Sequence, residues 1–174
     1  MIKDFNLLAT TFRGNERNVC SELQYLLEQI GESAPIVERT GVSGLVAAKT
    51  AFGAFEVIEK LRAILQERPY EFRYTLRVIP IEKVVRTDLT EIELATIALS
   101  SKIGEKETFR ITVEKRFSGI FTHEIIAVAA ENIKRKVDLS KPDKILLIEV
   151  VGGATGISVI RPNEILSVMK EKVL

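Results

Sequence analysis

FRITVEKRFSGIFTHEIIAVAAENIKRK, residues 109–136, is the stretch that decides the fold. Its first eight residues alternate apolar and polar side chains, with Phe109, Ile111 and Val113 on one side, which predicts a half-buried strand. From Thr122 onward the apolar residues recur at helical spacing, which predicts a helix directly after the turn. The expected apolar stripe of this helix is Ile126, Ala129, Ala130, Ile133 and Val137.

The residues before this stretch fall into six elements in the order β-α-β-β-α-β. Asn15 is expected to cap the first helix, and Pro69 ends the second. Alternation along the last strand places Arg73 and Arg77 on one face. This order is the ferredoxin-like arrangement, which we expect for a domain over residues 1–80. The expected strands are residues 5–12, 35–39, 45–49 and 72–79, and the expected helices follow Asn15 and span residues 54–65.

The residues on either side of the opening stretch predict a second unit, residues 81–174, with the order α-β-α-β-β-α. Its first helix is expected to begin with a capping box formed by Thr90 and Glu93. The chain is therefore expected to be an α/β (α+β) protein of two domains. The other expected elements are a bridge at 80–86, a helix at 88–103, strands at 145–151 and 157–160, and a closing helix from Pro162 that buries Ile165, Val168 and Met169.

The composition limits the class of protein. The chain has 174 residues, of which 46% are hydrophobic and 28% charged, the balance of a soluble globular protein. No apolar run approaches the roughly 20 residues of a membrane helix, and no cleavage site follows the first residues. We therefore expect a cytoplasmic protein without a membrane partner. One cysteine and one histidine cannot fill a four-ligand zinc site, so no metal or cofactor is expected, and Cys20 is interpreted as a small core residue.

Motifs for catalysis are absent from the sequence. The glycine-rich run GGATG at 152–156 precedes a strand, whereas a phosphate-binding loop precedes a helix, so a hairpin turn is expected. His123 has no serine or cysteine partner in a recognisable triad. We find no HExxH, P-loop or GxGxxG pattern. The sequence therefore predicts a protein that is not an enzyme, with no catalytic residues.

The distribution of basic residues points to a more specific surface. The net charge is only +1, so any nucleic-acid binding must come from local clusters. The basic run 134–136 is explained by the end of the expected helix, whose dipole favours cations. Lys115 and Arg116 lack such an explanation, because they lie together where a strand meets a turn. Phe117 and Phe121 flank that turn and either stack on a base or plug the core; the usual burial of aromatic residues favours the core.

The sequence from 109 to 160, FRITVEKRFSGIFTHEIIAVAAENIKRKVDLSKPDKILLIEVVGGATGISVI, resembles a THUMP domain. The resemblance rests on an Arg-ended strand, a turn into a Thr-started helix, a Val-Asp-Leu loop with Pro-Asp and a closing apolar hairpin. The preceding unit resembles the ferredoxin-like domain that accompanies THUMP domains. The closing GISVIRPNEI is similar to the stand-alone THUMP proteins that act as adaptors for tRNA cytidine acetylation.

This resemblance implies a non-catalytic tRNA-binding adaptor. Such a protein would hold the acceptor end of tRNA and present it to a separate modification enzyme, in this subfamily a cytidine acetyltransferase. Two alternatives remain open: a small-molecule-sensing or oligomeric regulatory protein, and an RNA-binding subunit of a separate tRNA methylating or thiolating enzyme. The oligomeric state and the modified nucleotide are not predicted. By position, the RNA-binding candidates are Lys115, Arg116, Phe117, Thr122, His123 and Arg110, with Arg13, Arg73, Arg77, Lys83 and Arg86 as further candidates on the neighbouring domain and the bridge.

Overall fold

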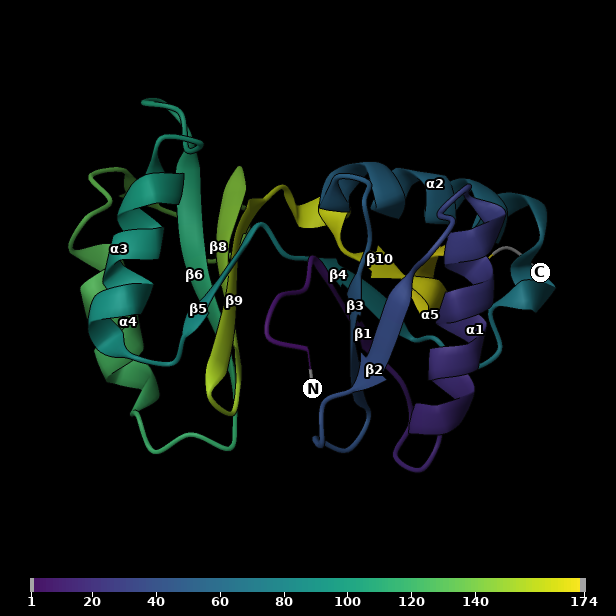
Figure 1. Ribbon diagram of the computed structural model, residues 1–174. Coiled ribbons are helices and arrows are strands. Elements are labelled where there is room, and N and C mark those ends of the chain that lie inside the picture. Colours follow the sequence, from purple (N-terminus) through teal and green to yellow (C-terminus); the bar gives the residue numbers. More distant parts are fainter. Residues whose placement is uncertain (1, 173–174) are drawn as a thin grey trace. The chain divides into compact units, whose positions relative to one another are not determined.

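A computed structural model describes residues 2–172, which form two compact units (Figure 1). The described part of unit 1 combines residues 2–81 with residues 164–172, and unit 2 comprises Glu82–Asn163. No helix within the described residues is long and apolar enough to cross a membrane. Each unit has its own sheet and its own apolar core, so each is described by itself.

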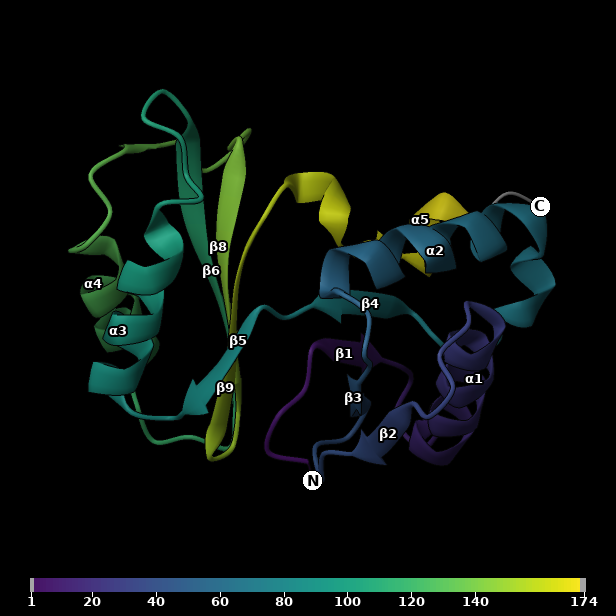
Figure 2. The same cartoon turned by 45° about the horizontal axis from the view of Figure 1, so that its top comes forward.

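Unit 1 has the predicted ferredoxin-like order. Its sheet is antiparallel with the strand order β10-β4-β1-β3-β2. Apolar residues of the two long helices and of the central strands form one buried cluster. Both views show α1 running beside β2 (Figure 2). The elements are β1 Leu7–Thr10, α1 Glu16–Gln29, β2 Ile36–Arg39, β3 Leu45–Lys49, α2 Ala54–Glu67, the 3-10 turn η1 Pro69–Glu71 and β4 Arg77–Pro80.

The last strand of the ferredoxin-like order is shorter than predicted. It begins at Arg77 instead of residue 72, so Arg73 and Arg77 do not share one strand. The reason is the carboxylate of Glu22 on α1, which accepts hydrogen bonds from the N–H groups of Arg73 (2.6 Å) and Thr75 (2.7 Å). Because a side chain satisfies these amides, the segment does not need a partner strand.

The end of the chain also differs from the prediction. The expected closing helix is divided into a 3-10 turn η2 (Pro162–Glu164), a short strand β10 (Leu166–Ser167) and a single helical turn α5 (Val168–Glu171). β10 pairs with β4, so residues from Glu164 onward belong to unit 1, whereas the prediction placed them in the second domain. Val168 is buried as predicted, but Met169 is exposed. The unpaired edge of β4 explains this return, because it supplies the hydrogen-bond partners that β10 needs.

Unit 2 is a mixed sheet with two helices packed on one face. Its strand order is β5-β9-β8-β6-β7, in which β6 runs parallel to both β8 and β7. The helices and the facing side chains of the strands form the second buried cluster. The elements are β5 Lys83–Arg86, α3 Leu89–Ser100, β6 Thr108–Arg116, α4 Thr122–Ala130, β7 Lys136–Val137, β8 Lys144–Val151 and β9 Ala154–Ile160.

Two helix predictions in unit 2 need correction. α3 is capped by Asp88, whose carboxylate accepts a hydrogen bond from the N–H of Glu91 (3.1 Å), and not by a box formed by Thr90 and Glu93. The second correction concerns the predicted bridge at 80–86, because residues 83–86 form β5 and pair with β9.

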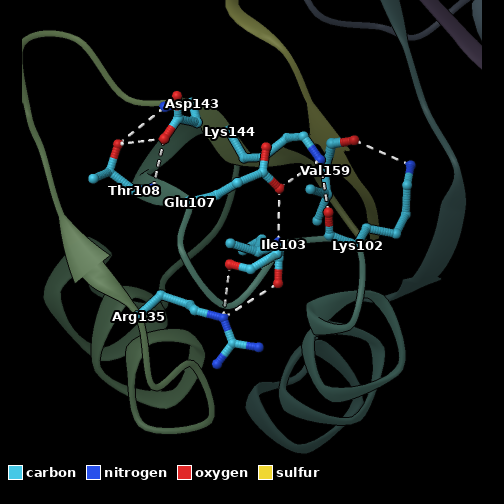
Figure 3. A network of polar contacts seen from close by, with 9 residues as sticks. Lys102, Ile103, Glu107, Thr108, Arg135, Asp143, Lys144 and Val159 are labelled. Carbon is cyan, nitrogen blue, oxygen red and sulfur yellow. Dashed lines mark hydrogen bonds and ion pairs between the residues drawn. The ribbon is translucent and has the colours of Figure 1, made fainter.

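α4 ends at Ala130, six residues before the predicted end. Its buried stripe consequently contains Ile125 and Ala129, while Ile126 and Ala130 are exposed. The chain leaves the helix because β7 pairs with the start of β6 and because Arg135 donates from Nε to the carbonyl groups of Ile103 (3.2 Å) and Gly104 (3.0 Å) (Figure 3). The helix dipole therefore does not explain the basic run 134–136.

Candidate nucleic-acid interface

Residues 115–123, which we call the lip, connect the end of β6 to the start of α4. The β8–β9 hairpin lies at the same end of the sheet as the lip, since the N–H of Gly152 donates to the carbonyl group of Arg116 (2.8 Å). The end of β5 lies at this end of the sheet too, because Arg86 pairs with Ala154, the first residue after the hairpin turn. The structure therefore brings Arg86 to the same end of the sheet as the lip.

Lys115 and Arg116 do not form one basic cluster. Successive strand residues point to opposite faces, and the two side chains follow that rule. Lys115 donates from Nζ to the carbonyl group of Ile120 (2.9 Å), which ties the lip to the strand that precedes it. Arg116 donates from Nη1 to Oε2 of Glu149 (2.6 Å), and Glu149 is fully buried. Arg116 is therefore held by a buried carboxylate, and Lys115 is the exposed cation of the pair.

The aromatic residues of the lip are exposed. The exposed fraction of the side chain is 77% for Phe117 and 60% for Phe121, so the interpretation of these residues as core plugs is wrong. The ring of Phe121 stacks on the ring of His123, with 5.5 Å between centroids and 16° between planes. Ile120 is the residue that packs on the core in their place. The sequence position of Phe121 does not show whether its side chain points inward, so only the structure shows that it is exposed.

The backbone of the lip is strained at Phe117. Its φ is +56°, the only positive value for a residue other than glycine within residues 2–172. A left-handed residue that is not glycine costs about 1–3 kcal/mol, and such strain clusters at functional sites. Since the side chain makes no contribution to the core, packing does not explain why phenylalanine occupies this position.

The first turn of α4 forms the far wall of the lip. Thr122 and His123 are its first two residues and both are exposed. Helix N-termini carry N–H groups without partners in the helix and a partial positive charge, which favours a phosphate. Glu124 lies in the same turn and offsets part of that charge. The lip therefore combines aromatic faces, one exposed cation and a weakly positive helix end.

Two predicted site residues of unit 2 lie away from the lip. Arg110 is six residues from Arg116 along β6, or about 20 Å in an extended strand. It donates from Nη1 to the carbonyl group of Leu139 (3.0 Å) and so fastens the loop before β8. Lys83 is exposed at the start of β5 and pairs with Ile157, three residues along β9 from the partner of Arg86.

The three predicted residues of unit 1 share one end of its sheet. Arg77 opens β4 and pairs with Thr10, the last residue of β1. Arg13 is exposed in the turn that follows β1, and Arg73 is exposed in the segment that precedes β4. The structure thus places these arginines at one end of the sheet of unit 1, although not on one strand.

Three basic residues at the opposite end of unit 2 make structural contacts. Lys144 pairs with Glu107 (3.2 Å), whose carboxylate also accepts from the N–H of Gly104 (2.7 Å) (Figure 3). These two contacts, the backbone hydrogen bond first, lower the pKa of Glu107. Arg135 binds carbonyl groups at the end of α3, as described above, and Lys102 pairs with Glu82 at 2.5 Å. These three cations hold the loop between α3 and β6 in place, so the lip remains the stronger candidate interface.

The fold and the lip define a class: a ferredoxin-like unit with an α/β unit whose strand β6 ends in an exposed aromatic turn. Residues 86–160 match the family model described as THUMP domain. The chain therefore contains a THUMP domain, and it lies within unit 2. No curated protein matches the sequence.

Several solved structures share this fold. PH1313 from Pyrococcus horikoshii OT3 has a TM-score of 0.64 and 17% identity, over 91% of this chain and 55% of that one. TrmN from Thermus thermophilus has a TM-score of 0.60 and 19% identity, over 91% of this chain and 47% of that one. A 4-thiouridine synthetase, solved as an RNA complex with bound ATP, has a TM-score of 0.57 and 17% identity, over 91% and 42%. The chain spans about half the length of these proteins, and the similarity shows the fold.

Proposed function

We propose that the protein binds the acceptor end of tRNA through the lip and presents the tRNA to a separate modification enzyme. The observation that carries the proposal is the exposure of Phe117 and Phe121 beside the cation of Lys115. Exposed aromatic faces next to a cation are the usual means of holding an unpaired nucleotide, because every base has a π face and a phosphate nearby.

The chemistry of the lip suits a single-stranded RNA end better than a duplex. Proteins recognise unpaired RNA by stacking its bases on aromatic side chains, whereas RNA helices are recognised by shape and backbone contacts. The stacked pair of Phe121 and His123 offers a pre-formed surface for a terminal base. The weakly positive start of α4 can accept one phosphate, and Arg86 adds a cation at the same edge.

The THUMP domain and the shared fold support this proposal. One solved structure with the same fold is described as a complex of a 4-thiouridine synthetase with RNA. The sequence lacks recognised catalytic motifs, so we assign the chemical step to another chain. Among such enzymes we propose a cytidine acetyltransferase, on the resemblance to the stand-alone THUMP adaptors.

Filter binding of labelled tRNA across a salt series tests the proposal. We expect binding that weakens steadily with salt, because phosphate contacts release counterions. Phe121→Ala should weaken binding by about 1–3 kcal/mol, the usual worth of one stacked base. Leu139→Ala is the matched control, since Leu139 is also an exposed apolar residue but lies in the loop after β7.

The RNA itself supplies a second control. Removal of the unpaired 3′ nucleotides from the tRNA should weaken binding by a similar amount and should abolish the effect of Phe121→Ala. Equal affinity for intact and truncated tRNA would show that the lip does not hold the RNA end. An absence of binding at low salt would reject RNA binding altogether and leave the regulatory alternative.

A further inference from the structure

The outer edge of unit 1 carries a groove that RNA binding by the lip does not use. It lies between α1 and the edge strand β2, which run side by side in both views (Figures 1 and 2). Its volume is about 540 Å³, and a second hollow of about 210 Å³ shares Arg39 and Gly41 with it. The groove is lined by Arg17, Cys20, Val37, Glu38, Arg39 and Gly41.

One wall of the groove is an open strand edge. Within residues 2–172, β2 pairs only with β3. The N–H of Thr40 donates to the carbonyl group of Leu45 (3.4 Å). This hydrogen bond shows which residues of β2 turn their backbone groups toward β3. In an antiparallel ladder every second residue turns its backbone groups toward its partner. Residues 36 and 38 therefore face β3, and the N–H and carbonyl groups of Val37 and Arg39 face the groove.

The side chains of the groove alternate in chemistry. Val37 points toward the helices, because it packs against the core of unit 1, and Arg39 shares that face. Cys20 lies opposite on α1, and burial raises the pKa of its thiol, so it remains an uncharged, weakly polar surface at neutral pH. Glu38 lies between Val37 and Arg39 and points to the other face of the sheet.

We propose that this groove binds an extended peptide of a partner protein by strand addition to β2. An added strand aligns its alternate side chains with those of the edge. The facing segment should therefore carry an apolar residue opposite Val37, a basic residue opposite Glu38 and an acidic residue opposite Arg39. Arg17, on the α1 side of the groove, adds a second cation for the acidic residue.

A second copy of this chain is a poor occupant of the groove. The β2 strands of two copies can pair antiparallel about a two-fold axis. Three registers place the residues whose backbone groups face outward opposite each other. One register sets Glu38 against Glu38 and another sets Arg39 against Arg39, and like charges in direct opposition are destabilising. The third sets Arg39 against Pro35, which has no N–H to donate.

RNA is a poor occupant for an electrostatic reason. Two carboxylates, Glu16 and Glu38, line the hollows together with the arginines. The N–H of Gly44 donates to Oε1 of Glu16 (2.8 Å) and lowers the pKa of that carboxyl group, so it stays negative at neutral pH. A phosphodiester backbone would meet these negative charges, whereas a peptide can match each charge with its opposite.

Fluorescence anisotropy with the labelled peptide Thr-Val-Lys-Glu-Lys-Val-Thr tests the proposal. This sequence reads the same in both directions, so it suits a parallel or an antiparallel added strand. The control peptide Thr-Val-Glu-Lys-Glu-Val-Thr exchanges the two charges. We expect the first peptide to bind about tenfold or more tightly than the control, Arg39→Glu to abolish that preference, and the exchange of both charges by Glu38→Arg with Arg39→Glu to reverse it.

The peptide backbone gives a test that leaves the protein unchanged. Only alternate amides of an added strand bond to the edge. N-methylation of the Val and Glu amides and N-methylation of the Lys amides should therefore differ, with one set abolishing binding and the other leaving it nearly unchanged. Equal effects of the two sets, or no binding at millimolar peptide, would overturn the proposal.

Cys20 reports occupancy of the groove, because it is the only cysteine of the chain. Bound peptide should slow its reaction with a thiol reagent. Displacement of the peptide by tRNA would assign the groove to RNA and overturn the proposal, as would protection of Cys20 that grows with protein concentration alone. None of these outcomes bears on RNA binding by the lip, which is measured separately.

Discussion

The ion pair between Arg116 and Glu149 gives the sharpest prediction. Glu149 is fully buried on the central strand β8, while Arg116 has 19% of its side chain exposed. Arg116→Met removes the cation and leaves a buried carboxylate behind. Loss of one partner of a buried pair costs about 3–5 kcal/mol, and the partial exposure of Arg116 favours the lower end of that range. For a chain of 174 residues we expect Tm to fall by roughly 6–12 °C.

Thermal unfolding and urea titration measure this loss. Lys49→Ala is the matched control, because Lys49 pairs with Asp4 at 3.0 Å on the surface and should contribute less than about 1 kcal/mol. The double variant Arg116→Met with Glu149→Leu should recover most of the stability, since it replaces both charges by apolar side chains. A single variant no less stable than the Lys49→Ala control would refute the reasoning.

The same double variant separates positioning from RNA contact. If Arg116 only holds the end of β6, the recovered protein should bind tRNA within about threefold of the parent. Lys115→Ala should instead weaken binding by about 1 kcal/mol or more, the usual worth of a hydrogen bond to a charged group. Weakened binding in a stable double variant would show that Arg116 contacts RNA directly.

Three further predictions concern single side chains. Phe117→Gly should change stability by less than about 1 kcal/mol, because glycine adopts positive φ without strain, while RNA binding falls; Phe117→Val should be clearly less stable by urea titration. Asp88→Ala should cost about 1 kcal/mol of unfolding free energy, whereas Thr90→Ala should cost less, because Asp88 is the cap. The lowered pKa of Glu107 adds stability above the ordinary glutamate value near 4.3 and loses it as pH falls below that value. The Tm of Glu107→Gln should therefore fall less than that of the parent on acidification, and parallel curves would contradict this reasoning.

The sequence predicted the ferredoxin-like order of the first unit because local patterns determine it. The spacing of apolar residues identifies α1 and α2, because each helix buries its apolar face against the core. The strand from 145 to 151 was also identifiable, since its residues other than Glu149 are all apolar, as in a strand buried on both faces. These signals are contained within each segment, so no knowledge of its neighbours was needed.

The predicted bounds of elements were wrong where a residue far away in the sequence supplies the hydrogen-bond partner of a segment. The strand β4 starts late because Glu22, 51 residues earlier than Arg73, binds the amides that a strand would have paired. α4 ends early because Arg135 and β7 find partners beside α3 and β6. The last residues joined unit 1 because the edge of β4 was available there. No local pattern contains the position of such partners.

The lip likewise combines features that the sequence predicted with features that only the structure shows. Its location, its two aromatic residues and its basic strand end were readable from the sequence, because a strand that turns into a helix is a local event. Only the tertiary structure decided that Phe117 and Phe121 face solvent and that Arg116 is held by Glu149, since burial depends on what the sheet and the helices cover. The sequence by itself thus determined where the strand turns into the helix and which residues lie there, and three-dimensional packing decided which of their side chains are exposed.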